Sequence, residues 1–431
     1  MNDRERFLAV ARFETPDYVP IFGFGGAPGM SGGALKHTHD RLIATGMPKQ
    51  IGGCVDNWKM RDLESWHRYW GTTGQIDLDF KMAWGAEGFR TTTRREGEFE
   101  VIESESGEIT RQVIDNANTY SMPQFVRYPV RDRASWELYK TRMTPRQFMS
   151  KEDLEMNCRR FDNRNKPLRI HAGSTYGTVR DLFGVEAASV MLYDDPELIQ
   201  DILAFYQAHF ENHVAPLIER LKPEAVDMWE DIGYNVGLLI SPKHFRQFCA
   251  PFYRSVAEVA ASAGVAVRVV DSDGCAMELV PLLAECGFNA LYPFESKGKN
   301  DLMKLRQNHP KFIFFGNLEK EVVNEGNEHL IEPEIMSKVP PLLKQGGYFP
   351  NGDHGLQPMV TFKNLCKFMT LLHKVCGNPE GEFPRISFRA GGWGDNGDSR
   401  FPHGSRAQAI RERRLVAGSG TAQAGPALAK R

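Results

Sequence analysis

The sequence lacks any run of the roughly 18–20 consecutive apolar residues that a membrane-spanning helix needs. Its N-terminus, Met1–Arg6, is charged from the first turn and does not lead into the long apolar segment that secretory leaders carry. We therefore expect neither a membrane span nor a signal peptide, and we expect a cytoplasmic protein.

Cysteine is also scarce for a disulfide-stabilised fold. The seven cysteines are odd in number, scattered along the chain, and never spaced as CxxC or CxxxC. We expect them to be free thiols in a reducing compartment, most of them packed as small core residues.

A strong excess of one charge is missing as well, because the formal net charge is -2. The charge is unevenly distributed, however. Residues 388–431 contain eight Lys and Arg but three Asp and Glu, which leaves the rest of the chain at about -7. An acidic body of this kind argues against general nucleic-acid binding.

The first part of the chain predicts a short helix, a strand and a small sheet. Residues 2–12 predict a helix because Asn2 and Glu5 have the spacing of a capping box. The apolar residues 19–22 predict a strand. Between about 85 and 130, alternating segments separated by Glu-Gly and Ser-Gly turns predict an inserted antiparallel β meander.

From about residue 165, strand-like and helical segments alternate, which is typical of parallel β-α-β units. The predicted strands are 168–172, 225–229, 265–270, 290–294, 312–315 and 348–349, and the predicted helices are 196–221, 242–263, 276–286, 300–308 and 332–345. Six such units, the strand predicted at 19–22 and one further strand, for which the chain is long enough, predict an α/β fold, a (β/α)8 TIM barrel. A doubly wound sheet is the alternative.

Polar residues after nearly every strand favour the barrel, because such barrels build their sites there. We expect one barrel domain over residues 1–383 that contains the β meander. Residues 384–431 are rich in Gly, Arg, Ala and Ser and have no hydrophobic period, so we expect a disordered basic tail.

Acidic, amide and imidazole side chains follow five of the predicted strands. They are Glu230 and Asp231, Asp271 and Asp273, Glu295, Asn317, and Asp353 with His354. Capping of the next helix explains any single one equally well. Asp271 and Asp273 alternate with Ser272, however, so both face the same way. A barrel would gather all of these side chains at one mouth.

Such a cluster of carboxylates is costly unless their mutual repulsion is relieved. Three functions would relieve it: a hard-metal site, recognition of a cationic substrate, or acid–base catalysis by carboxyl groups with raised pKa values.

Three further residues are candidates for contact with a substrate. Phe24 lies in the glycine-rich segment 23–26, which is not GxGxxG and predicts a pocket rim rather than a phosphate cradle. His171 and Tyr176 lie at another strand end. His171 is a candidate ligand or base, and a hydrogen-bonded core histidine is an equally good interpretation.

Several short segments together resemble the uroporphyrinogen decarboxylase superfamily. They are residues 2–7, 16–21, 229–234, 240–242, 251–253, 271–274, 293–295 and 352–354. The resemblance extends over about residues 2–376 and implies a (β/α)8 barrel with its pocket at the carboxyl-terminal mouth. The superfamily contains porphyrinogen decarboxylases, which need no cofactor, and cobamide-dependent methyltransferases, which commonly use zinc.

The sequence departs from both branches. Where the decarboxylases carry an arginine that grips substrate carboxylates, residues 22–27 contain none. Where the thiol-activating methyltransferases have His-x-Cys and a later Cys, the matching residues are Asp271, Asp273 and Asp353. A zinc–thiolate site is therefore excluded at these positions. An oxygen-rich site remains, with His354 or Glu295 as a further ligand.

The resemblance implies an O-demethylase-type methyltransferase that passes a methyl group from a small methylated substrate, for example a methoxylated aromatic, to a corrinoid (cobamide) on a partner protein. Zinc or another divalent metal would be bound by Asp271, Asp273, Asp353 and His354. The catalytic residues would be Asp271, Asp273, Glu230 and His354, and those contacting substrate would be Phe24, His171, Tyr176, Asp231, Glu295 and Asn317.

Two alternatives stay open. One is a cofactor-independent decarboxylase that uses Asp271 or Asp273 without a metal, and the other is a non-catalytic barrel that binds a small molecule. The family also implies a homodimer. We expect no nucleic-acid or membrane partner.

Overall fold

The computed structural model describes residues 1–23, 30–56, 59–78, 84–85, 88–114, 123–145 and 149–386. The chain divides into Met1–Ile386 and Ser387–Arg431. The predicted tail therefore lies almost wholly outside the described residues, and every described helix and strand belongs to the first unit.

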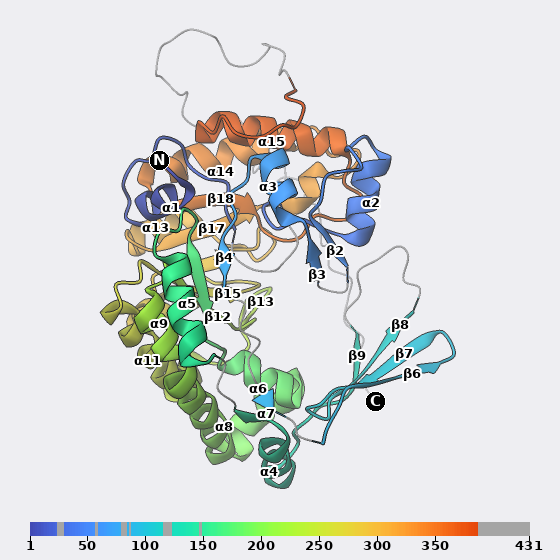
Figure 1. Cartoon of the computed structure of the whole chain (residues 1–431), viewed down its shortest axis with the longest axis vertical. Helices are drawn as coiled ribbons and strands as arrows, with labels where there is room; N and C mark the ends of the chain where they lie inside the picture. The colour runs from blue at the N-terminus through green and yellow to red at the C-terminus, as the bar shows by residue number, and fades with distance from the viewer. Residues whose placement is uncertain are drawn as a thin grey trace, which may run out of the picture. The chain divides into compact units, whose positions relative to one another are not determined.

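A sheet of seven parallel strands forms the centre of the fold (Figure 1). In spatial order the strands are β18 (Tyr348–Gly352), β17 (Ile313–Leu318), β16 (Ala290–Pro293), β15 (Val267–Ser272), β12 (Ala225–Trp229), β11 (Leu168–His171) and β4 (Ile76–Asp77). The six strands predicted between residues 168 and 349 are all present. Three of them, β15, β17 and β18, continue beyond their predicted carboxyl-terminal ends.

Helices connect the strands, as the predicted parallel units require. After β11 come α6 (Tyr176–Phe183), α7 (Val185–Asp194), α8 (Pro196–His209), η1 (Phe210–Val214) and α9 (Ala215–Leu221). After β12 come α10 (Pro242–His244), η2 (Phe245–Cys249) and α11 (Ala250–Ser262). The later connections contain α12 (Leu279–Glu285), α13 (Leu302–Asn308), η3 (Lys320–Val323) and α14 (Ile331–Gln345), and α15 (Phe362–Cys376) follows the last strand.

The predicted closure into an eight-stranded barrel is not found among the described residues. Val19–Phe22 is not a strand: Val19 N–H donates to the Cys376 carbonyl (3.0 Å) and Thr73 N–H donates to the Ile21 carbonyl (3.0 Å). Pro20 has no N–H with which to join a ladder. The segment still packs beside β18, because the Phe22 and Phe349 rings lie 5.8 Å apart. The fold is therefore α/β with a curled seven-stranded sheet.

The predicted meander forms a separate antiparallel sheet in the order β6 (Thr92–Glu96), β7 (Phe99–Glu103), β8 (Ile109–Val113) and β9 (Gln124–Arg127). This sheet projects from the side of the body in Figure 1. The remaining described elements are α1 (Asp3–Ala11), β1 (Ala34–Leu35), α2 (Lys36–Ala44), β2 (Cys54–Asp56), β3 (Lys59–Arg61), α3 (Leu63–Trp70), β5 (Trp84–Gly85), α4 (Arg133–Arg142), β10 (Thr144–Pro145), α5 (Lys151–Phe161), β13 (Gly233–Tyr234) and β14 (Gly237–Leu238).

Helix α1 closes the apolar end of the sheet interior. The predicted capping box is confirmed, since Asn2 Oδ1 accepts from Glu5 N–H (2.9 Å) and Glu5 Oε2 accepts from Asn2 N–H (2.8 Å). The helix places Phe7 against Phe349 of β18, with ring centroids 5.1 Å apart. Both rings are fully buried with apolar residues of β12, β15, β16 and β17, so this end of the interior is packed.

No helix among the described residues is long and apolar enough to cross a membrane.

A buried carboxylate connects α1, the segment before β11 and the start of β12. Glu224, 3% exposed, accepts from Arg4 Nε (2.6 Å), Arg164 Nε (2.8 Å) and the Leu168 N–H (2.8 Å). Burial opposes ionisation of Glu224, but these donors outweigh it and lower the pKa of Glu224. The carboxylate is therefore ionised and paired at neutral pH.

We predict that Glu224→Gln lowers the free energy of unfolding by about 3 kcal/mol, because it leaves the buried guanidinium group of Arg164 without its anion. Urea denaturation at pH 7 measures this. Since the pKa of Glu224 is lower in the folded state, its contribution is complete above about pH 5, where the unfolded-state carboxyl is ionised too, and is lost as the pH falls through the folded-state value. The difference between variant and wild type should shrink accordingly. Equal stability of the two proteins at pH 7 would contradict the prediction.

Candidate functional site

The interior of the sheet changes from apolar to charged toward the carboxyl ends of its strands. Parallel pairing aligns His171 with Asp227 and Val269 in one row, and Trp229 with Asp271 and Tyr292 in the next. Because side chains alternate along a strand, both rows face the same side as the apolar core residues Val267 and Ala290. The strand ends therefore bring polar side chains together over a packed apolar floor.

Arg169 supplies positive charge inside this acidic region. Its Nε donates to Asp77 Oδ1 (2.8 Å), and its Nη1 lies 3.6 Å from Asp227 Oδ2. The same Asp227 oxygen accepts from His171 Nδ1 (2.9 Å). Burial opposes ionisation of Asp227, but Arg169 and His171 outweigh it and lower the pKa of Asp227. Arg169 was not predicted as a site residue, although it shares one face of β11 with the candidate His171, two residues further along the strand.

Three half-buried side chains from the ends of β15, β16 and β18 form a compact group, which we call the mouth triad: Asp273, Glu295 and His354. Each offers one ligand atom, and these atoms all lie within 4.8 Å of one another. His354 Nε2 lies 3.2 Å from Asp273 Oδ2 and His354 Nδ1 lies 3.4 Å from Glu295 Oε1. Glu295 is held in place because its Oε2 accepts from the Gly274 N–H (2.7 Å).

His354 has one nitrogen in a hydrogen bond and one without a partner. The 3.4 Å contact of Nδ1 with Glu295 does not have hydrogen-bond geometry, so Nδ1 is a buried polar atom with no partner among the described residues. Burial lowers the pKa of His354, but the hydrogen bond to Asp273 and the two carboxylates of the triad outweigh it and raise that pKa. The imidazole thus sits where a cation, either its own proton or a metal, is favoured.

The mouth triad fits a divalent metal. An ion about 2.0–2.6 Å from each ligand atom spans such separations. Two carboxylate oxygens and one imidazole nitrogen suit zinc, manganese or iron(II), and no thiolate is needed. Asp273 and His354 of the predicted metal set belong to this group, as does Glu295, which was predicted as a further ligand, whereas Asp271 and Asp353 lie outside it.

Asp271 lies on β15 just inside the triad. Its carboxyl group accepts no hydrogen bond from any residue that the structure describes. Burial raises the pKa of Asp271 well above its usual range, and the nearby carboxylates Asp273, Asp231 and Asp227 raise it further against the opposing effect of Arg169. A neutral carboxyl group at this place can donate a hydrogen bond or a proton to a bound molecule.

Asp353 accepts hydrogen bonds from the backbone of two neighbouring loops. It is 2% exposed, its Oδ2 accepts from the Ser296 N–H (2.8 Å), and its Oδ1 accepts from the Lys320 N–H (3.3 Å). Both oxygens thus hold the loops after β16 and β17 in position. This position gives Asp353 a positioning role beside its predicted role as a ligand.

Glu230, predicted as catalytic, has no exposed surface. Its Oε1 accepts from the N–H and hydroxyl of Thr175 (both 2.7 Å), and its Oε2 accepts from the Gly177 N–H (2.9 Å). The side chain therefore satisfies the free N–H groups at the start of α6. We expect Glu230 to fix the segment after β11 rather than touch a substrate.

The other predicted contact residues are spread over different surroundings. Asp231 pairs with Arg180 Nη2 (3.3 Å), whose guanidinium lies 5.0 Å from the Trp229 ring centroid. Asn317 is buried and donates from Nδ2 to the Phe294 carbonyl (2.9 Å). Tyr176, the first residue of α6, is 1% exposed, so it does not line an open surface. Phe24 lies outside the described residues.

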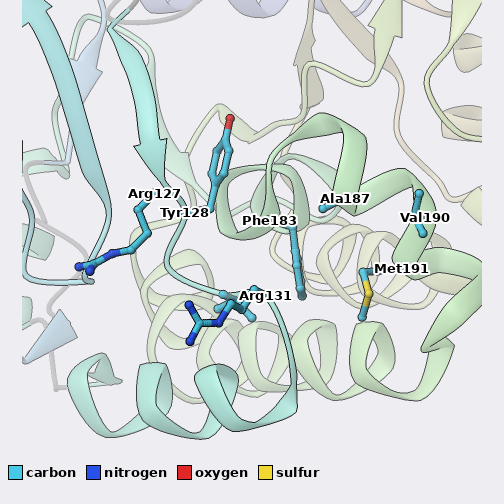
Figure 2. Close-up of a pocket in the computed structure, with 8 residues that line it drawn as sticks. Arg127, Tyr128, Arg131, Phe183, Ala187, Val190 and Met191 are labelled. Carbon is cyan, nitrogen blue, oxygen red and sulfur yellow. The ribbon is translucent and has the colours of Figure 1, made fainter.

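A separate pocket of about 250 Å³ lies between the β9–α4 connection and helices α6 and α7. Figure 2 shows apolar side chains of α6 and α7 facing Arg127 and Arg131 across it. It is lined by Arg127, Tyr128, Val130, Arg131, Phe183, Ala187, Val190 and Met191. None of the acidic residues of the mouth lines it, so we do not assign it to the candidate site.

Residues 154–375 match the sequence profile of the family described as Uroporphyrinogen decarboxylase (URO-D), which is just over half of the chain. The chain belongs to the URO-D family. This confirms the resemblance predicted from the short segments, and it identifies the protein as a member of a family of enzymes.

Among solved structures, the URO-D-family chain is similar to a methyltransferase from Methanosarcina mazei. The TM-score is 0.52 at 14% sequence identity, over 88% of this chain and 98% of that chain. Identity this low shows a shared fold and no more. No curated protein sequence matches the chain.

We predict that the protein binds about one equivalent of cobalt(II), a spectroscopic substitute for zinc, through the mouth triad. Glu295→Gln and His354→Gln should each weaken binding by more than about 100-fold, because even changes around ligands cost 10–100-fold. Absorption titration in the visible range measures this.

The control is Glu285→Gln on the outer helix α12, where the carboxylate pairs with Arg246 at the surface. This variant should bind cobalt as the wild type does. If Asp271→Asn abolishes binding and Glu295→Gln does not, the set predicted from the sequence is right and the triad is wrong.

Proposed function

We propose that this URO-D-family protein transfers a methyl group from a small methylated donor, with methoxylated aromatics as the first candidates, to a corrinoid carried by a partner protein. The observation that carries the proposal is the mouth triad. It places two carboxylates and an imidazole within 4.8 Å at the carboxyl ends of β15, β16 and β18, where they can hold a metal without thiolates.

The charge of the mouth argues for methyl transfer over porphyrinogen decarboxylation. A porphyrinogen carries several carboxylates, and Asp273, Glu295 and Asp231 would repel them. Arg169 does not relieve this repulsion, because it is already paired with Asp77 and close to Asp227. The fold shared with a Methanosarcina mazei methyltransferase supports the same choice.

Each part of the site has a task in this proposal. Asp273, Glu295 and His354 would hold a divalent metal, which when bound would act as a Lewis acid toward an oxygen or nitrogen of the donor. Asp271, kept neutral by burial and by its acidic neighbours, would donate a hydrogen bond to the substrate. Asp231, held by Arg180, would orient the substrate at the rim.

A decarboxylase is the second candidate, because a neutral Asp271 could also protonate the carbon left by departing carbon dioxide. The two functions differ in their product. One yields a methylated corrinoid, and the other yields carbon dioxide and needs no partner.

We predict that the wild-type protein methylates a reduced corrinoid protein from at least one member of a panel of methoxybenzoates, methoxyphenols and methylated amines. Absorption of the methylated corrinoid measures the reaction. Glu295→Gln should lower the rate by about 100-fold or more, because it removes one side of the triad from a site that works by electrostatic stabilisation.

Glu285→Gln serves again as the matched control and should retain the wild-type rate. Release of carbon dioxide from a carboxylated substrate without any corrinoid would overturn methyl transfer in favour of the decarboxylase. An unchanged rate in Glu295→Gln would show that the mouth triad does not serve the reaction. The corrinoid partner, a homodimeric state and a cytoplasmic location remain part of the proposal.

A further inference from the structure

A second pair of side chains at the mouth, on β11 and β12, is separate from the triad. His171 Nδ1 and Asp227 Oδ2 lie 2.9 Å apart, which is hydrogen-bond distance. The Asp227 side chain is 7% exposed and the His171 side chain is 37% exposed. The carboxylate is therefore buried behind an imidazole whose other edge is open.

The free nitrogen of this imidazole separates it from a structural histidine. His373 is 1% exposed, and both of its nitrogens contact carbonyl groups, Nδ1 that of Asn378 (3.3 Å) and Nε2 that of Trp70 (3.0 Å). His171 Nε2, in contrast, has no hydrogen-bond partner among the described residues. A histidine that merely stabilised the fold would not need an open nitrogen.

Asp227 can stabilise a positive charge on the imidazole of His171. Arg169, whose Nη1 lies 3.6 Å from Asp227 Oδ2, keeps the carboxylate ionised although it is buried. An ionised Asp227 fixes the proton of neutral His171 on Nδ1 and stabilises the imidazolium when Nε2 is protonated as well. Its second oxygen, Oδ1, is buried and has no partner in the described part of the chain.

The pair faces the same interior as the rest of the site. His171 and Asp227 are aligned in one row of the sheet, and Asp271 projects from the next row on the neighbouring strand β15. Adjacent strands lie about 4.8 Å apart and β12 lies between β11 and β15, so His171 and Asp271 belong to strands about 10 Å apart. A small aromatic molecule above Asp271 would extend from the triad toward His171.

We propose that His171 is the general acid–base residue of the site and that Asp227 is its positioning residue. The chemistry of this step rests on the proposed function. In methyl transfer from an aryl ether, the bond between the methyl carbon and oxygen breaks and its electron pair stays on oxygen. Reduced corrinoid supplies the electron pair of the new cobalt–carbon bond. The leaving oxygen takes the Nε2 proton of the His171 imidazolium, which becomes neutral with its remaining proton on Nδ1 and regains the lost proton from solvent before the next turnover.

The first test examines the pair in the free protein and needs no substrate. NMR of protein labelled with ¹⁵N-histidine should show neutral His171 with its proton on Nδ1, whereas unconstrained histidine favours Nε2. Asp227→Asn should shift the population toward the Nε2 form, and His171→Gln assigns the signal. A proton on Nε2 in the wild type, unchanged in Asp227→Asn, overturns the proposal.

The second test uses aryl methyl ethers whose leaving phenols differ in acidity. A weakly acidic phenol needs a proton as it leaves, whereas a nitrophenol does not. His171→Gln should therefore slow transfer from 4-methoxytoluene by about 100-fold or more but slow transfer from 4-nitroanisole by less than about fivefold. Equal losses for both ethers overturn the role of His171, since damage to the fold would not depend on the leaving group.

His329→Gln, at an exposed position before α14, is the matched control and should leave both rates unchanged. The two proposals fail in different ways. If the wild type methylates no corrinoid from any donor, the proposed function fails, while the NMR experiment still decides whether the pair exists. If transfer occurs and the leaving-group dependence is absent, His171 alone is excluded.

Discussion

The guanidinium group of Arg169 is the charge on which the acidic mouth depends. It lies inside the sheet with its Nε 2.8 Å from Asp77 and its Nη1 3.6 Å from Asp227. A buried carboxylate without such a partner takes up a proton, because ionisation in a low-dielectric interior is costly. Arg169 keeps Asp227 ionised, whereas Asp271, which Arg169 influences less than its acidic neighbours do, has a pKa well above its usual range. One cation thereby separates two nearby aspartates into a base-like and an acid-like group.

This separation divides the mouth into regions with different chemistry. On one side the mouth triad collects negative charge around His354, where a metal fits. On the other side Asp227 turns one nitrogen of His171 inward and leaves the other open. Other carboxylates at the same strand ends hold the backbone: Glu230 binds the start of α6, and Asp353 binds the loops after β16 and β17. Carboxylates at the same strand ends therefore have different surroundings, which are set by the donors around them.

Much of the fold follows from local pattern. The capping box at Asn2, the meander and the order of strands and helices after residue 165 are all recognisable because each depends on neighbours in the chain. The strand predicted at residues 19–22 was wrong, because an apolar segment resembles a strand whether or not a partner pairs with it. Val19–Phe22 is buried against β18 but bonds to Thr73 and to the end of α15 instead of joining a ladder. Pairing is a property of the whole sheet, so hydrophobicity alone could not decide it.

The candidate site shows even more clearly which properties the local sequence can predict and which depend on the tertiary structure. The sequence by itself determined that acidic side chains would meet at one mouth, because parallel strands end on the same side and Asp271 and Asp273 alternate with Ser272. Only the tertiary structure decided their tasks. Whether a carboxylate accepts hydrogen bonds from the backbone depends on N–H groups distant in sequence, as Asp353 with Ser296 illustrates. Whether a histidine is paired depends on a neighbouring strand, as His171 with Asp227 illustrates. Residue type and spacing set the charge of the mouth, and long-range hydrogen bonds set which of its atoms remain available.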